Sequence, residues 1–106
     1  MSLELYGPEG VEVTDKWLRS LRDLPKLRAL YLRRAKITDA GLAELTGLSD
    51  LRELSLSDTS ISDEGLKHIA RLSDLQWLEV TGTRVTKAGL KTLREKMPRL
   101  VIVGEP

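Results

Sequence analysis

Few of the 106 residues are of the types that catalyse reactions or bind metals. The sequence has no cysteine, which excludes disulfides, thiolate metal sites and a cysteine nucleophile. Its one histidine, His68, lies between apolar residues at helical spacing and has no visible set of partner residues. General acid–base chemistry needs a nucleophile and an orienting group within hydrogen-bond reach. We therefore interpret His68 as a solvated residue on the polar side of a helix, and we do not predict an enzyme.

Acidic residues recur at a fixed spacing, with Asp15, Asp39 and Asp63 at equivalent positions. Such a series can be interpreted as a calcium site. However, it supplies a single carboxylate from each repeat and has Lys87 at its fourth position, whereas calcium needs at least about six converging oxygens. The glycines are spread along the chain and form no phosphate-binding loop. We therefore predict neither a metal site nor a cofactor.

The charges are nearly balanced, with 17 basic and 16 acidic residues and a net charge of +1. This balance predicts no strong field that would attract nucleic acid or an anionic membrane. The first residues lack a basic start and a long apolar run, and Pro8 and Gly10 follow closely, so we predict neither a signal peptide nor a membrane span. We expect one soluble domain in the cytoplasm.

The sequence repeats every 24 residues, and a repeat of this length indicates a solenoid. Leu27, Leu51 and Leu75 open three similar units, of which the third gains one residue before Pro98. The first unit keeps the later part of the pattern but is irregular at its front, as expected of a terminal unit that caps a stack. We thus predict a degenerate N-terminal cap repeat, three full repeats, and a terminal strand with a tail: residues 1–26, 27–50, 51–74, 75–99 and 100–106.

Each unit changes its hydrophobic period midway. Leu54 and Leu56 flank a polar residue, as in a half-buried strand, whereas Leu66, Ile69 and Leu72 recur every third residue, as on one face of a short helix. Strands and helices therefore alternate. A hydroxyl residue at each predicted helix start can cap the first amides, and an acidic residue usually follows at the positive end of the helix dipole. These capping residues are Thr14, Thr38, Ser62 and Thr86.

Glycines recur just inside the predicted helices, at Gly41, Gly65 and Gly89. A residue without a side chain lets neighbouring repeats approach closely at this position. The first unit has Trp17 at the equivalent position, and no similar unit precedes it. We therefore expect the large apolar side chain of Trp17 to cover the exposed end of the core.

The repeats resemble the leucine-rich repeat superfamily, whose consensus is LxxLxLxx(N/C/T)xL. Segment 51–61 has Leu51, Leu54, Leu56, Thr59 and Ile61 at the consensus positions, and segment 75–85 matches in the same way. Segments 37–42 and 61–66 also resemble the (I/V)TDxGL signature of the cysteine-containing type, found in F-box substrate receptors and bacterial repeat proteins. The resemblance implies an α/β fold: a right-handed leucine-rich repeat solenoid with a parallel sheet on the concave side and short helices on the convex side.

Two features depart from the pattern of that family. The family often has Asn or Cys where this chain has Val11, Ala35, Thr59 and Thr83, so we expect only a partial ladder of buried polar side chains bonded to the loop backbone. No F-box segment precedes the repeats, so the sequence gives no direct reason to expect a role in ubiquitin transfer.

The strands place a row of residues on the surface opposite the core. If Leu30, Leu54 and Leu78 point inward, alternation puts their neighbours, among them Ala29, Ser55, Ser57 and Thr81, on the concave surface. Aromatic, arginine and apolar side chains on that surface are typical of binding hot spots, so we predict that it binds a protein partner. The predicted partner-binding residues are Tyr31, Arg33, Glu53, Trp77, Glu79 and Ile102, the last placed beside Trp77 by the extra residue in the third repeat.

Several alternatives stay open at this point. Trp77 can instead cover the C-terminal edge of the chain's own core by packing on Ile102. The unpaired edge at residues 100–103 favours a homodimer through the terminal strand. A structural or designed repeat domain without a dedicated partner is another alternative. A fragment of a larger repeat protein is also consistent with a strand surface smaller than the roughly 800 Å² per partner of a stable interface.

Overall fold

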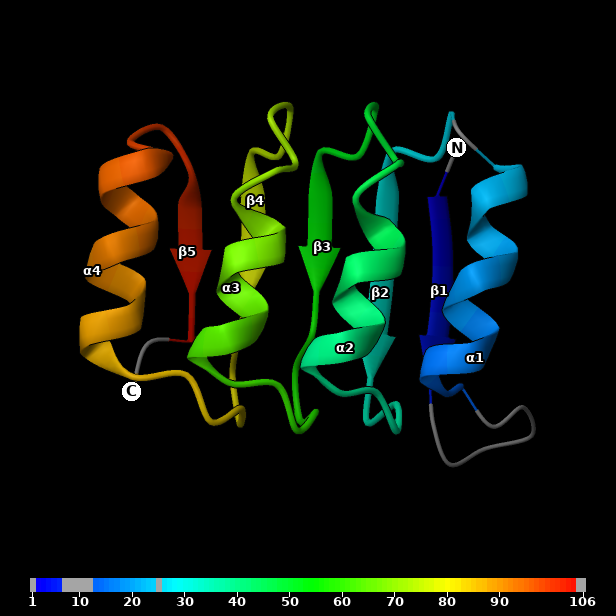
Figure 1. The fold of residues 1–106 in the computed structure, drawn as a ribbon, viewed down its shortest axis with the longest axis horizontal. Helices are drawn as coiled ribbons and strands as arrows, with labels where there is room; N and C mark the ends of the chain where they lie inside the picture. Colours follow the sequence, from blue (N-terminus) through cyan, green and yellow to red (C-terminus); the bar gives the residue numbers. More distant parts are fainter. Residues whose placement is uncertain (1, 7–12, 25, 105–106) are drawn as a thin grey trace.

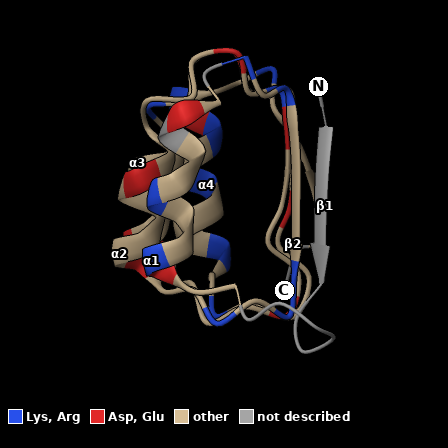
Figure 2. Ribbon diagram, turned by 90° about the vertical axis from the view of Figure 1, so that its right-hand side faces the viewer, with Lys and Arg blue, Asp and Glu red and all other residues tan. Residues whose placement is uncertain are grey.

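The computed structural model describes residues 2–6, 13–24 and 26–104, which form two layers (Figure 1). One layer is a parallel sheet of five strands, and helices that all cover the same face of the sheet form the other (Figure 2). The strands are β1 (Ser2–Tyr6), β2 (Ala29–Arg33), β3 (Glu53–Ser55), β4 (Trp77–Glu79) and β5 (Val101–Val103). The helices are α1 (Asp15–Leu18), α2 (Asp39–Leu42), α3 (Asp63–Ile69) and α4 (Lys87–Lys96), and the 3-10 helices η1 (Arg19–Asp23) and η2 (Ala43–Leu45) extend α1 and α2.

The strands lie in the sheet in the order in which they occur in the sequence. Each strand is parallel to the next, and the register aligns Leu30, Leu54, Leu78 and Ile102 across β2 to β5. Every crossover passes through a helix on the same face of the sheet and is right-handed (Figure 1). The predicted fold, a right-handed α/β solenoid in which one strand and one helix make up each repeat, is therefore confirmed.

The core lies between the sheet and the helices and consists of aliphatic side chains. In the repeat of residues 51–74 Leu54 and Leu56 enter it from the strand side, and Leu66 and Ile69 enter it from α3, all of them buried. Burying one such side chain stabilises the fold by about 1.5–3 kcal/mol, so the stacked repeats supply the stability that disulfides give other small domains. Trp17 of the first repeat is partly buried and packs against the core.

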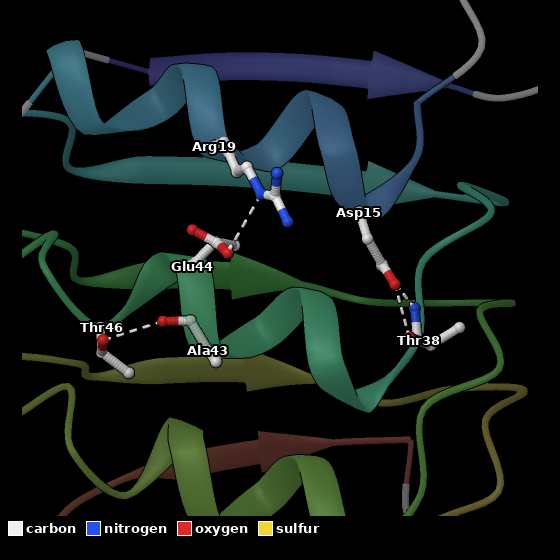
Figure 3. A network of polar contacts seen from close by, with 6 residues as sticks. All are labelled: Asp15, Arg19, Thr38, Ala43, Glu44 and Thr46. Carbon is white, nitrogen blue, oxygen red and sulfur yellow. Dashed lines mark hydrogen bonds and ion pairs between the residues drawn. The ribbon is translucent and has the colours of Figure 1, made fainter.

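The series of aspartates joins consecutive repeats by hydrogen bonds. In the first joint the carboxylate of Asp15 accepts the backbone N–H of Thr38 at 2.8 Å and its hydroxyl at 2.5 Å (Figure 3). An ion pair between Arg19 and Glu44, 3.4 Å apart, adds to the same joint. The two bonds of the first joint recur in the next two joints, between Asp39 and Ser62 and between Asp63 and Thr86.

The helices begin where the hydroxyl residues predicted them, but most of these hydroxyls do not cap their own helix. Among the described helix starts, only Thr86 makes the side-chain cap, accepting the N–H of Gly89 at 3.1 Å. The hydroxyls of Thr38 and Ser62 instead donate to the aspartate of the preceding repeat. The prediction that all four cap their helices is therefore wrong, because a hydroxyl turned toward the carboxylate of the previous repeat makes the cap only at Thr86, where it also accepts the N–H of Gly89.

The recurring glycines are required by these joints. A Cβ at Gly41 would overlap the carboxylate of Asp15, and a Cβ at Gly89 would overlap that of Asp63. At Gly65 the overlap would be with Asp39 and with a methyl group of Leu42. The predicted close approach of neighbouring repeats at glycine is confirmed, and the group that approaches is the aspartate side chain.

The polar ladder under the turns is partial, as the sequence indicated. Thr59 and Thr83 each donate a hydroxyl at 2.7 Å to the backbone carbonyl three residues earlier. Ala35 is buried at the equivalent position and has no polar group to offer. Val11 lies outside the described residues.

Candidate functional site

The strand face is the side of the sheet that the helices leave uncovered (Figure 2). Five of the six predicted partner-binding residues lie on it, because each alternates with a buried leucine or valine of its strand. Together with Ser55 of β3 they form one group, which we call the strand-face cluster: Tyr31, Arg33, Glu53, Ser55, Trp77 and Glu79.

Tyr31 and Trp77 form the aromatic centre of the strand-face cluster. Their ring centroids are 6.2 Å apart and their planes meet at 71°, an edge-to-face arrangement. The rings belong to β2 and β4, so they meet across β3. Trp77 is half-buried, and Tyr31 accounts for part of the cover.

Ser55 lies on β3 between the two aromatic residues and is fully buried. Its hydroxyl donates to Oε1 of Glu79 at 2.6 Å. The sequence placed Ser55, Ala29 and Ser57 on the concave surface, but all three are buried. Alternation along a strand predicts the face on which a side chain lies, but it does not predict exposure.

The two carboxylates of the cluster are held by neighbouring donors. Glu79 accepts the hydroxyl of Ser55 and pairs with Nη2 of Arg33 at 3.9 Å. Glu53 accepts the hydroxyl of Tyr31 at 3.0 Å. Each carboxylate has further lone pairs, so the cluster can accept hydrogen bonds from amide, ammonium or guanidinium groups beside an aromatic surface.

Ile102 does not belong to this surface, and its predicted place beside Trp77 is wrong. The register pairs Trp77 with Val101, and Ile102 with Leu78 on the core side, where Ile102 packs against the core. The third full repeat has one extra residue before Pro98, but the next segment is one residue shorter and so restores the register. Leu100 precedes the inward Ile102 by two positions, whereas Leu75 precedes the inward Leu78 by three.

Val101 therefore occupies the place on the strand face that had been assigned to Ile102. Its side chain is 56% exposed, and that of Val103 is 39% exposed. Packing of Trp77 on Ile102, which was the basis for regarding Trp77 as a cover for the core, is excluded by this register. The shortened spacing between Leu100 and Ile102 is the sequence signal that identifies Val101.

His68 lies on α3, in the layer on the other side of the sheet, and is half-buried rather than fully solvated. Within the described residues no group of three His, Asp or Glu side chains converges as metal ligands do. In the same part of the chain no helix has the length and apolar character needed to cross a membrane.

Comparison with known proteins agrees with the repeat pattern. Residues 23–45 and 47–70 match the family described as Leucine Rich repeat. No curated protein matches the sequence.

Solved structures with a similar fold include the following two. The structure of Chaetomium Mex67:Mtr2 subunits matches with a TM-score of 0.76 and 21% identity over 96% of this chain and 78% of the other. An internalin (inlF) from Listeria monocytogenes matches with a TM-score of 0.51 and 21% identity over 82% of this chain and 38% of the other. Residues 23–45 and 47–70 are therefore leucine-rich repeats, and the chain has the leucine-rich repeat fold.

Proposed function

We propose that this leucine-rich repeat domain is a protein-interaction module that binds its partner through the strand-face cluster. The observation that carries the proposal is the aromatic pair of Tyr31 on β2 and Trp77 on β4, in a cluster that also contains the carboxylates Glu53 and Glu79. Solenoid proteins use such extended surfaces for binding. Tyrosine, tryptophan and arginine are also the residues that contribute most to binding energy at protein interfaces.

The side chains of the cluster indicate the chemistry of the partner. Glu53 and Glu79 outnumber the one cation, Arg33, so the surface favours a partner that brings hydrogen-bond donors or positive charge. Val101 pairs in register with Trp77 and extends the aromatic centre by an exposed apolar side chain. An apolar side chain of the partner is therefore expected over Trp77 and Val101, with donors on either side of it.

The internal hydrogen bonds of the cluster favour binding without rearrangement. Tyr31 and Ser55 are each fixed by a bond to a glutamate, so less side-chain entropy is lost when a partner binds. The chain measures 35 × 25 × 19 Å, and the strand face lies across its two longer dimensions. A partner must therefore also cover the turns at the strand ends to bury the roughly 800 Å² of a stable interface.

The solved structures agree with this class of function but do not identify the partner. Mex67 occurs in its structure together with Mtr2 subunits, so a protein of similar fold takes part in a protein complex. At 21% identity the likeness carries the fold alone. The partner of the present chain is proposed only by its chemistry.

The test compares the two tryptophans of the chain. Proteins captured from cell extract by the intact domain would be purified, and their dissociation constants measured by calorimetry with wild type, Trp77→Ala and Trp17→Ala. We expect Trp77→Ala to weaken binding by at least about 2 kcal/mol, roughly thirtyfold in Kd, because it removes the aromatic centre. Trp17→Ala is the matched control, since Trp17 lies at the other end of the stack. Equal Kd values for wild type and Trp77→Ala would overturn the proposal.

The alternative function is a structural repeat domain without a dedicated partner. The internal bonds of Tyr31 and Ser55 favour it, because they satisfy these groups with no partner present. This alternative predicts that no captured protein loses affinity with Trp77→Ala, and that the substitution acts only on folding. Circular dichroism of the two tryptophan variants separates a loss of folded protein from a loss of binding.

A further inference from the structure

The charge of the chain is concentrated in its last full repeat. Residues 75–99 contain six basic and two acidic residues, a net charge of +4, although the whole chain carries only +1. All six cations are exposed, and most of them lie on α4, where Figure 2 shows them in blue. They are Arg84, Lys87, Lys91, Arg94, Lys96 and Arg99.

Three of these cations lie on the outer side of α4, which faces away from α3. The side of α3 that faces α4 contributes Asp63, Leu66, Lys67 and Ala70 to the cleft between the two helices. Residues 24 positions later hold the same place on α4, because the two helices belong to successive repeats. The exposed residues on the outer side of α4 therefore include Lys87, Lys91 and Arg94, whereas Leu90, which corresponds to Leu66, is buried.

The charge at this position is inverted relative to the earlier repeats. At each of the three joints an aspartate accepts the backbone N–H and the side-chain O–H of a residue in the next repeat, as Asp63 does from Thr86. On α4 the equivalent residue is Lys87, which has only donors. A group that packs on the outer side of α4 must therefore supply acceptors, and preferably negative charge.

The strand next to this helix offers a second set of contacts. Val101 donates its N–H to Gln76 and Val103 accepts the N–H of Val80, so the backbone groups of Ile102 between them point to the outer edge of the sheet. In the described part of the chain β5 is the last strand of the sheet. Val101 and Val103 are both exposed beside that edge.

We propose that this end of the domain binds an extended acidic segment of another protein by adding a strand to β5. We call the surface the C-terminal end surface and define it by Lys87, Lys91 and Arg94 on α4 and by residues 101–103 of β5. The segment's backbone pairs with the edge at Ile102, its apolar side chains pack beside Val101 and Val103, and its carboxylates meet the cations of α4.

A second copy of the chain does not fit this surface. Antiparallel pairing of two β5 strands about a two-fold axis would continue the sheet and place the two α4 helices side by side. Lys87, Lys91 and Arg94 of both copies would then face one another, and like charges across an interface oppose binding. Homodimerisation through the terminal strand, expected from the sequence, is thus disfavoured by the charges on the helix beside it.

The test begins with a displayed library of random peptides, about twelve residues long, selected on the intact domain. An added strand of six residues spans about 20 Å, so this length covers the edge of β5. We expect selection to enrich peptides with several Asp or Glu residues and alternating apolar residues. A synthetic peptide of the enriched sequence then serves as the probe.

Two triple variants with the same change in net charge test the cations of α4. Lys87→Glu, Lys91→Glu and Arg94→Glu together should weaken binding of the probe at least about tenfold, because three favourable contacts become repulsive. The matched control is Lys26→Glu, Arg28→Glu and Arg52→Glu, three exposed cations outside the last full repeat. We expect the control to weaken binding less than about threefold, through long-range attraction alone. If the α4 variant fails to fold, Lys87→Gln with Lys91→Gln gives a milder test of the same surface.

Hydrogen exchange tests the backbone pairing. The Val101 amide is bonded to Gln76 and should be protected with or without the probe, whereas the Ile102 amide should become protected only when the probe is bound. Tyr31 lies on β2, separated from β5 by β3 and β4. Tyr31→Ala should therefore leave binding of the probe unchanged while it weakens a strand-face partner, so failure of this proposal is distinguishable from failure of the strand-face proposal.

Four results would overturn the proposal. One is selection of peptides without an excess of acidic residues, and another is an equal loss of binding in the two triple variants. The third is unchanged exchange of the Ile102 amide when the probe is bound. The fourth is evidence that something else binds this surface. Sedimentation could show that the free domain is a dimer and that Val101→Glu abolishes the dimer, or single-stranded DNA could displace the probe.

Discussion

The joint between α3 and α4 predicts that two destabilising substitutions compensate each other. Asp63 accepts the N–H and the hydroxyl of Thr86 at 2.8 and 2.6 Å, and its carboxylate fills the space that a Cβ on Gly89 would need. The three atoms nearest to that Cβ position all belong to Asp63. Asp63→Ala and Gly89→Ala therefore disrupt the same contact.

The expected magnitudes follow from the two hydrogen bonds and from helix propensity. Asp63→Ala should lower the free energy of unfolding by about 2 kcal/mol, since each bond to this partly exposed carboxylate contributes about 1 kcal/mol. Gly89→Ala should cost about 1–2 kcal/mol, because the methyl group displaces the carboxylate from both bonds. In the Asp63→Ala background the methyl group meets no carboxylate, so Gly89→Ala should there stabilise by about 0.5 kcal/mol, as alanine favours the helix.

Urea denaturation of wild type, both single variants and the double variant measures the coupling. Gly47→Ala is the matched control, because nothing lies within 4 Å of its Cβ position. Its effect should have the same sign with and without Asp63. If the effects of Asp63→Ala and Gly89→Ala add to within about 0.5 kcal/mol, the carboxylate is not the reason for the glycine.

Three further predictions concern single residues. Leu78→Ala should lower the free energy of unfolding by about 2–5 kcal/mol, because it opens a cavity in the core, and a loss below about 1 kcal/mol in urea would contradict the register. Arg34 has φ at 60°, so Arg34→Gly should stabilise by up to about 1 kcal/mol, and a lower melting temperature would show that its side chain makes stabilising contacts. His68→Ala should change the Kd of a strand-face partner less than about twofold by calorimetry, because His68 lies on α3 behind the sheet, and a tenfold loss would place the site on the helices.

The fold was predictable because two local patterns recur with one period. Leu54 and Leu56 indicated a strand, Leu66 and Ile69 a helix, and the constant spacing of the units indicated that equivalent leucines align across the sheet. The boundaries of the repeats stay predictions. The hydroxyl residues were interpreted within single helices, whereas the acceptor of Thr38 lies in the preceding repeat, a contact that local propensity does not encode.

The site was less predictable, because its details depend on side chains from different strands. Alternation placed Tyr31 and Trp77 on one face, but nothing in either strand indicates that their rings meet across β3. The burial of Ser55 follows from the size of its neighbours and from its bond to Glu79, not from its own position. Ile102 was misplaced because the prediction allowed for the extra residue before Pro98 but not for the residue that is missing after Leu100. The missing residue restores the register and pairs Trp77 with Val101.

The two proposed surfaces differ in the use of their carboxylates, and this difference sets what each can bind. On the strand face Glu53 and Glu79 are held by short side-chain bonds and keep further acceptor capacity at the surface. On the helix side each aspartate of the joints is already bonded to the next repeat, and Lys87 stands where the series would continue. A partner that brings donors therefore suits the first surface, and one that brings acceptors suits the second.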